Sequence, residues 1–208
     1  SHVHRSVNSN QVILRHQQLA ATHFLKELRG FGLLADVVGS GKTFEACAVL
    51  SELAVRGKMK SLLLVVPSQV YDSWIDVLEN KFGLGKGVLV GVADAEFGEC
   101  ETLSDGATVR PTKPFIVKAE DFVNWRESAI KNVLFDVVVV DEAHHLCAEE
   151  GRYAKAMKLL SLLMQTKKKA NSTYCVLLSA TPHSGNLEKM FRLWYFIRCK
   201  GGNPDDFD

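Results

Sequence analysis

Hydrophobic and polar residues follow each other along this chain in two patterns, one with a helical period and one typical of buried strands. Residues 14–29 place apolar side chains such as Leu19 and Phe24 among polar ones, which predicts a helix that ends at Gly30. Residues 61–67 are almost continuously apolar, as expected for a strand that is covered on both faces of a sheet. The two patterns then repeat along the sequence.

This repetition defines the fold class. The predicted strands are residues 31–35, 61–67, 88–92, 115–117, 135–140 and 174–178. The predicted helices are residues 14–29, 42–56, 72–82, 120–131, 152–165 and 187–197. Alternation of this kind predicts an α/β fold with a central, mostly parallel β-sheet and helices on both faces. Residues 94–113 are polar and rich in glycine and proline, so we expect a long exposed loop there.

The composition is that of one folded domain over residues 1–208, with 47% hydrophobic and 24% charged residues. The 25 basic and 24 acidic residues nearly balance, which excludes a strongly basic histone-like binder and an acidic tail protein. No apolar run approaches the roughly 20 residues of a membrane span, and residues 1–9 do not have the pattern of a secretory signal. The five cysteines form no CxxC pair, so we expect reduced thiols in a cytoplasmic protein.

A glycine-rich turn with the sequence G-S-G-K-T follows the predicted strand at 31–35 and opens the next helix. Glycines let successive backbone N–H groups point at phosphate oxygens, and the helix N-terminus adds its positive end. The predicted nucleotide contacts are Gly39, Ser40, Gly41, Lys42 and Thr43. In this pattern the lysine neutralises the outer phosphates of ATP, and the threonine hydroxyl ligates Mg²⁺. Asp36 stands where the full pattern has its first glycine.

Two carboxylates follow the predicted strand at 135–140. Asp141 should lie at the carboxyl edge of the sheet, beside the phosphate turn, where ligands collect in such folds. We expect Asp141 to hold hydrated Mg²⁺, and Glu142 to orient and polarise the attacking water. Glu142 and Lys42 are therefore the predicted catalytic residues.

Two further segments are candidates for coupling the nucleotide site to its surroundings. Residues 144–147 contain two histidines and a cysteine, but no second ligand cluster occurs at a spacing typical of a metal site. We interpret His145 as a polar link between the nucleotide site and a neighbouring element. Ser179, Ala180 and Thr181 end a later strand, and their hydroxyls are expected to bond the strand end that carries the two carboxylates and so to sense phosphate loss.

The motifs G-S-G-K-T, D-E-A-H-H-L and L-S-A-T-P, in this order, resemble motifs I, II and III of the superfamily 2 helicase-like ATPases. The resemblance is stronger to the Swi/Snf-type branch, especially its bacterial members with a D-E-A-H-H-L box. Residues 14–18, L-R-H-Q-Q, are similar to the family's L-R-P-Y-Q segment, whose glutamine reads the adenine edge, a role that carries over to Gln18. Residues 64–68 with the following Trp74 resemble motif Ia. The resemblance covers nearly the whole chain.

The resemblance implies a RecA-like P-loop lobe, the first of two, in an ATP-driven motor that moves on double-stranded DNA and remodels protein–DNA complexes. The second RecA-like lobe, absent from this chain, would supply the transition-state arginines, so we expect the isolated lobe to hydrolyse ATP hardly at all. Sequence-independent contacts to DNA phosphates are expected from Pro67, Ser68 and Lys118. Lys118 and Ala119 depart from the family's usual Thr or Ser with Tyr, and S-A-T replaces the G-T-P of eukaryotic remodellers.

Two alternative functions share the same lobe. One is a strand-separating helicase or a restriction or phage-defence motor, which measured strand displacement would favour. The other is a nucleotide-gated P-loop scaffold without catalysis, which would need Lys42 but not Glu142. An ABC-type ATPase is disfavoured because the sequence has no L-S-G-G-Q-like signature.

Overall fold

The computed structural model describes most of the chain. The described residues are 14–35, 41–83, 90–92, 94–147, 151, 153–167, 173–181 and 186–206. Two predicted nucleotide contacts, Gly39 and Ser40, lie outside these residues, whereas Gly41, Lys42 and Thr43 lie within them.

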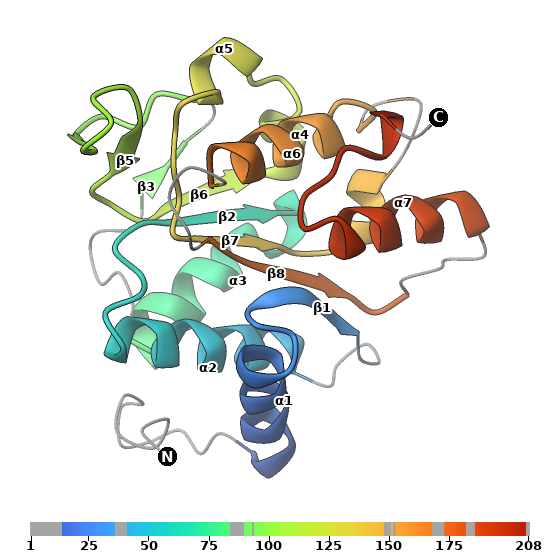
Figure 1. Cartoon of the computed structure of the whole chain (residues 1–208). Coiled ribbons are helices and arrows are strands. Elements are labelled where there is room, and N and C mark those ends of the chain that lie inside the picture. The colour runs from blue at the N-terminus through green and yellow to red at the C-terminus, as the bar shows by residue number, and fades with distance from the viewer. Residues whose placement is uncertain are drawn as a thin grey trace.

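A parallel six-stranded sheet forms the centre of the molecule and confirms the predicted fold class (Figure 1). Its strands are β1 (Phe31–Ala35), β2 (Leu62–Val66), β3 (Val90–Gly91), β6 (Phe115–Lys118), β7 (Val137–Val140) and β8 (Tyr174–Ser179). They are ordered β1-β8-β7-β2-β6-β3, and every neighbouring pair is parallel. β2 and β7 are buried along their whole length, which explains why their sequences are continuously apolar.

The helices are α1 (Arg15–Lys26), α2 (Lys42–Val55), α3 (Tyr71–Asp76), α4 (Ala119–Phe122), α5 (Glu127–Ile130), α6 (Ala156–Lys167) and α7 (Leu187–Arg198). Shorter turns are the 3₁₀ segments η2 (Ser68–Val70), η4 (Ala143–Cys147) and η5 (Pro204–Asp206), and a π-helical segment, η3 (Val77–Lys81). Most predicted helices are present within a few residues of their expected ends.

The predicted helix over 120–131 is wrong, because the structure divides it into α4 and α5. The side chain of Asn124 donates to the carbonyl of Glu120, and the Trp125 N–H donates to the carbonyl of Phe122, so the chain turns tightly here. This turn buries the Trp125 ring edge-on against Phe122, with 5.1 Å between ring centroids. Burial of two aromatic rings therefore outweighs continuation of the helix.

Each face of the sheet has its own hydrophobic core. α1, α2 and α3 cover one face, and α4 to α7 cover the other (Figure 1). Successive strand residues point to opposite faces, so Leu64 packs with Val139 in the first core while Leu63 packs with Val138 in the second. Each such fully buried aliphatic side chain contributes about 1.5–3 kcal/mol of transfer free energy.

The predicted loop at 94–113 is largely exposed, as expected, but it is not without regular structure, because it contains an antiparallel hairpin, β4 (Cys100–Thr102) and β5 (Val109–Pro111). The carboxylate of Asp105 closes the turn by accepting from the backbone N–H groups of Ala107 and Thr108, at 3.0 and 2.8 Å. Phe97 anchors the segment before the hairpin, since its ring lies 5.3 Å from that of Phe115 in the core. The dipeptide Asp105–Gly106 was the available turn signal.

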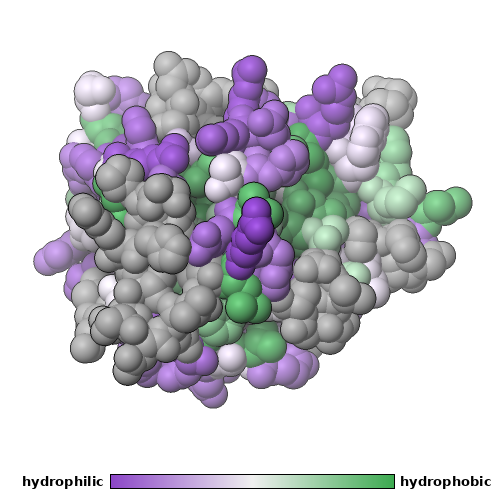
Figure 2. Space-filling view, turned by 90° about the horizontal axis from the view of Figure 1, so that it is seen from below, coloured by the Kyte–Doolittle hydropathy of each residue, from purple (hydrophilic) through white to green (hydrophobic). Residues whose placement is uncertain are grey.

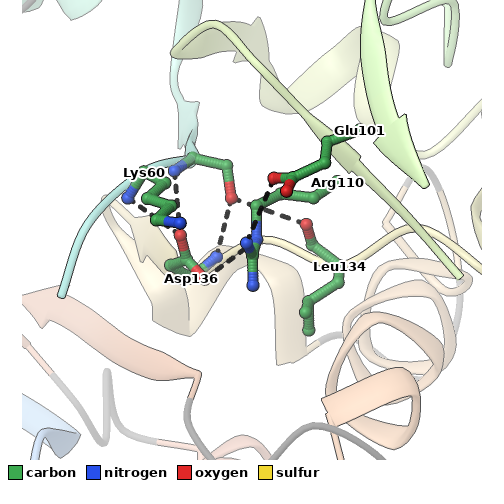
Figure 3. A network of polar contacts seen from close by, with 6 residues as sticks. Lys60, Glu101, Arg110, Leu134 and Asp136 are labelled. Carbon is green, nitrogen blue, oxygen red and sulfur yellow. Dashed lines mark hydrogen bonds and ion pairs between the residues drawn. The ribbon is translucent and has the colours of Figure 1, made fainter. Parts of the chain in front are cut away.

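A polar network attaches this hairpin to the amino ends of β2 and β7 (Figure 3). One carboxylate oxygen of Asp136 accepts from the backbone N–H groups of Lys60 and Ser61, at 2.8 and 3.0 Å. Its other oxygen lies 3.3 Å from Nε of Arg110, as a contact between charges without hydrogen-bond geometry. Arg110 also pairs with Glu101 of β4 at 3.4 Å. The buried Asp136 carboxylate therefore joins three segments that are distant in sequence.

The surface around α1 is mixed in character. Seen from below, hydrophobic side chains lie between hydrophilic ones (Figure 2), and α1 and its flanks expose Leu14, Leu19 and Leu28. Of the helices that the structure describes, none combines the length and the apolar character needed to cross a membrane. All five cysteines are free thiols, and three of them, Cys47, Cys147 and Cys175, are buried.

Candidate functional site

The predicted site residues gather at the carboxyl edge of the sheet because β1, β8, β7 and β2 are parallel and end on the same side. In the sheet, β8 lies between β1, which leads toward the phosphate turn, and β7, which leads to Asp141. The charge of Lys42, at the start of α2, nevertheless reaches the Asp141 carboxyl, so the two side chains belong to one site.

Gly41 precedes the first residue of α2 and has a positive φ of 93°, a conformation that disfavours other residues. A Cβ at this position would lie 2.5 Å from the side-chain nitrogen of Gln17. Lys42 and Thr43 then form the first turn of α2, where the backbone N–H groups point along the helix axis. The start of α2 is therefore half-buried and carries a lysine and a hydroxyl, with a glycine directly before them.

The structure places Gln17, the neighbour of the predicted Gln18, against Gly41. Gln17 is buried, and its side-chain oxygen accepts from the backbone N–H of Leu14 at 3.1 Å, which directs its amide nitrogen toward Gly41. Gln18 is half-buried one position further along α1. Adjacent glutamines carry no signal in the sequence that distinguishes them, because a helix turns successive side chains by about 100°.

Asp141 follows β7 directly and is held at both carboxylate oxygens. Its Oδ2 accepts from the indole N–H of Trp74 at 2.8 Å, and its Oδ1 accepts from the backbone N–H of Glu142 at 2.9 Å. Burial raises the pKa of the Asp141 carboxyl above its usual value, while these two hydrogen bonds and the charge of Lys42 act in the opposite direction. The carboxylate is thus fixed in orientation, and a cation beside it would favour the ionised form.

Glu142 has a φ of 48°, which is uncommon for a residue with a side chain and is found often at functional sites. Its Oε2 is buried and has no hydrogen-bond partner among the described residues. Nδ1 of His144 lies 3.2 Å from this oxygen, without hydrogen-bond geometry. At the carboxyl edge of the sheet, Oε2 of Glu142 therefore accepts no hydrogen bond from the described residues.

His144, rather than the predicted His145, forms the polar link to β8. Its Nδ1 lies 2.9 Å from Oγ of Ser179, and both side chains are buried. His145 is exposed and lies against His144, with 4.0 Å between the ring centroids. Burial lowers the pKa of His144 to about 4, and the charges of His145 and Lys189 act in the same direction. His144 is consequently a neutral imidazole near pH 7.

The hydroxyls at the end of β8 were expected to bond the strand end that carries Asp141 and Glu142. Ser179 instead contacts His144, and it also accepts from the backbone N–H of Thr181 at 3.2 Å. Ala180 and Thr181 line the cavity described below. Beyond the backbone pairing of β7 and β8, His144 therefore adds a side-chain contact between the end of β8 and the segment after β7.

A cavity of about 610 Å³ opens beside these residues. Its lining residues are Pro67, Gln69, Val70, Ala119, Glu120, Asp141, Glu142, His144, His145, Leu146, Tyr153, Ala180 and Thr181. The cavity is large enough for a small ligand. It extends from the two carboxylates to the turn after β2, where DNA contacts were predicted.

The predicted DNA contacts lie on this side of the molecule but already have protein partners. The Ser68 hydroxyl donates to Glu120 at 2.8 Å, and the Tyr153 hydroxyl donates to the same carboxylate at 3.3 Å. The exposed Lys118 places its ammonium 5.3 Å from the ring centroid of Tyr71. Sequence reasoning missed Glu120 and Tyr153, since neither belongs to a motif.

The parallel sheet, its strand order and the G-K-T helix start define a RecA-like α/β lobe. The family model for the SNF2-related domain matches residues 16–207. The chain therefore belongs to the SNF2-related family, which confirms the resemblance seen in the sequence.

Curated relatives and solved structures agree with this assignment. The chain is 27% identical over 184 residues to "Uncharacterized ATP-dependent helicase YqhH" of Bacillus subtilis, covering 86% of this chain and 28% of that protein. It is 29% identical over 179 residues to "RNA polymerase-associated protein RapA" of Photobacterium profundum, covering 84% and 17%. The chain thus spans less than a third of these relatives.

The structure of the Sulfolobus solfataricus SWI2/SNF2 ATPase core in complex with dsDNA superposes with a TM-score of 0.68 at 19% identity, covering 93% of this chain and 37% of that one. The structure of the Sulfolobus solfataricus SWI2/SNF2 ATPase core domain gives a TM-score of 0.62 at 20% identity, covering 90% of this chain and 35% of that one. This likeness shows that the two chains share a fold.

Proposed function

We propose that this chain is the ATP-binding lobe of a DNA-dependent ATPase of the Swi/Snf type, which couples ATP hydrolysis to movement on double-stranded DNA and to remodelling of protein–DNA complexes. One observation carries the proposal. The start of α2 at Lys42, the carboxylates of Asp141 and Glu142, and the end of β8 at Ser179 meet at one edge of the sheet. The ATPase core in the S. solfataricus structure is bound to dsDNA, and the YqhH relative is named an ATP-dependent helicase.

The residues present fit a nucleotide with Mg²⁺. Lys42 would neutralise the outer phosphates, and the backbone N–H groups at Gly41 and at the start of α2 would bind phosphate oxygens. The hydroxyl of Thr43 and the carboxylate of Asp141 offer the hard oxygen donors that Mg²⁺ prefers. When bound, the ion would offset the charge that develops on the phosphates. Gln17, whose amide nitrogen lies against Gly41, would contact the nucleotide beside the phosphate turn.

Glu142 would act on water at this site. Its side chain is half-buried and lines the cavity, so the carboxylate can accept a hydrogen bond from an attacking water there. His144 lies beside this carboxylate but is neutral, so it does not form an ion pair with Glu142. Through its contact with Ser179, His144 would then transmit a movement of the nucleotide's phosphates to the end of β8.

DNA would bind on the side of the cavity formed by the turn after β2. Lys118 is exposed and held over Tyr71, where it can meet a phosphate, while Pro67 and Ser68 precede and begin η2. The carboxylate of Glu120 lies at this surface and repels phosphates, so Ser68 would contact DNA through its backbone N–H rather than its hydroxyl. Such contacts are independent of base sequence.

The full-length protein would supply a second RecA-like lobe, with the arginines that stabilise the transition state. The relatives are several times longer than this chain, which leaves room for such a lobe. Bound between the lobes, ATP would be hydrolysed only when both are in place. ATP turnover is therefore proposed for the whole protein.

Two variants of the full-length protein test the proposal, with ATP binding measured by calorimetry and turnover measured with and without duplex DNA. Lys42→Ala should abolish ATP binding, because the phosphates lose their lysine. Glu142→Gln should bind ATP normally but lose turnover. Lys58→Ala, an exposed change beyond the end of α2, is the control. ATP hydrolysis that does not respond to DNA in the unchanged protein would contradict the proposal.

A further inference from the structure

Trp74 combines a buried position with a single polar contact. It lies on α3 with only 1% of its surface exposed, and its indole N–H donates to Oδ2 of Asp141 at 2.8 Å. The other oxygen of this carboxylate accepts from the backbone of Glu142. Each carboxylate oxygen can accept two hydrogen bonds or ligand contacts, so one position on each oxygen is left for a cation or its water.

The indole cannot turn away without disturbing the core. It packs in the cluster that contains Leu64 and Val66 of β2, Val139 of β7, and Leu78 of the following π-helical segment. A buried N–H that loses its acceptor costs about 1–3 kcal/mol, which further favours the observed orientation. Packing therefore fixes the donor, and the donor fixes the plane of the carboxylate.

The position of α3 connects this contact to the turn after β2. η2 ends at Val70 and α3 begins at the next residue, so Trp74 is one helical turn from the segment that lines the cavity. The helix then continues as the π-helical segment η3, a form of local helix distortion that occurs often at functional sites. A movement of η2 and α3 would be transmitted to Asp141 through the indole N–H.

We infer that Trp74 is a positioning residue that orients Asp141 for Mg²⁺ through its indole N–H and links the metal site to the turn after β2. The inference rests on the proposed function, because it takes Asp141 as the metal ligand. Residues of this kind, which hydrogen-bond to a metal ligand, change metal affinity by roughly 10- to 100-fold when they are replaced.

The test replaces the donor while keeping an aromatic ring. In Trp74→Phe, the affinity of the ATP-loaded chain for Mn²⁺, measured by electron paramagnetic resonance, should fall roughly tenfold or more. The affinity for ATP in the presence of a chelator, measured by calorimetry, should stay within about twofold, since phosphate contacts do not involve Trp74. A purely structural role would lower both affinities together.

Trp125→Phe is the matched control. Trp125 is also a buried tryptophan, 5% exposed, but it packs edge-on against Phe97 and Phe122 in the other core. It should lose comparable packing without any change in the affinity for Mn²⁺. Equal loss of Mn²⁺ affinity in the two variants, or none in Trp74→Phe, would overturn the inference.

A second measurement applies if Trp74→Phe does not fold. With 5-fluorotryptophan in the unchanged chain, the Trp74 resonance, assigned by Trp125→Phe and Trp194→Phe, should shift when Mg²⁺ is added to ATP-loaded protein. The Trp125 resonance should not shift. A Trp74 resonance that does not shift would refute the link between Trp74 and the metal site. If the unchanged chain shows no Mg²⁺-dependent ATP binding at all, the proposed function fails and this inference with it. Normal Mg²⁺-dependent binding with a static resonance removes the inference alone.

Discussion

Nδ1 of His144 lies 2.9 Å from the hydroxyl oxygen of Ser179, and this contact joins the segment after β7 to the end of β8. Both side chains are buried, so water does not replace the contact easily. The same Nδ1 is 3.2 Å from Oε2 of Glu142. A displacement at the end of β8 would therefore move His144 and, with it, the surroundings of the Glu142 carboxylate, which is proposed to act on water.

Removal of the Ser179 hydroxyl should break the side-chain contact between the end of β8 and His144. Ser179→Ala in the full-length protein should keep ATP affinity but reduce DNA-stimulated turnover roughly two- to thirtyfold, since coupling residues modulate by about 0.5–2 kcal/mol. Steady-state hydrolysis at saturating DNA measures the effect. Ser161→Ala is the control, because the buried Ser161 hydroxyl on α6 has no hydrogen-bond partner among the described residues. Equal turnover in both variants would argue against coupling through His144.

Stability should depend on pH through His144. Its pKa is about 4 in the folded chain against an ordinary 6.5, so the unfolded state binds the proton more readily. The stabilising contribution is complete above pH 6.5 and is lost as the pH falls from 6.5 through 4. Urea unfolding at several pH values should show a shallower decline for His144→Gln than for the unchanged chain. Parallel profiles would show that His144 does not titrate in this way.

Two neighbouring glutamines allow a direct comparison. Gln17→Ala should weaken ATP binding roughly tenfold and reduce the preference for ATP over GTP, the loss expected from one or two hydrogen bonds. Gln18→Ala should change neither, because Gln17 is the side chain that lies against Gly41. Calorimetry with both nucleotides decides between them, and thermal unfolding checks that α1 remains intact. The reverse result would restore the assignment made from the sequence.

The hairpin attachment should be sensitive to Asp136. Asp136→Ala removes the acceptor for Lys60 and Ser61 and the charge beside Arg110, and should cost about 2–4 kcal/mol of the free energy of unfolding. Glu101→Ala removes the exposed partner of the same arginine and should cost less than about 1 kcal/mol. Denaturant unfolding compares the two. Similar losses of stability in the two variants would mean that the hairpin contact of Arg110, rather than the buried Asp136 carboxylate, accounts for the loss.

Much of the fold follows from local pattern. β2, β7 and α2 are predictable because a buried strand has a continuous apolar sequence and α2 begins directly after the glycine turn. The hairpin at 100–111 and the break between α4 and α5 depend on single side chains, Asp105 and Asn124, that bond to the backbone in one conformation only. The periodicity of hydrophobic residues along the sequence does not indicate such side-chain to backbone hydrogen bonds.

The site was predictable as a set of motifs but not as a set of contacts. Motif order placed Lys42, Asp141 and Ser179 at one edge, since parallel strands end together. The choice of His144 over His145 depends on which histidine η4 turns inward, and that is a property of packing. The contact between Trp74 and Asp141 joins residues far apart in sequence, and no short motif contains both.

The place of β8 in the sheet also governs when the site can form. Phe31 pairs with Cys175, so β1 pairs with a strand that is synthesised long after it. Until then the facing edges of β1 and β7 have unpaired N–H and C=O groups, and closing so long a loop has an entropic cost. During synthesis, the nucleotide site can therefore form only after β8 has followed β7, and these two edges remain unpaired until then.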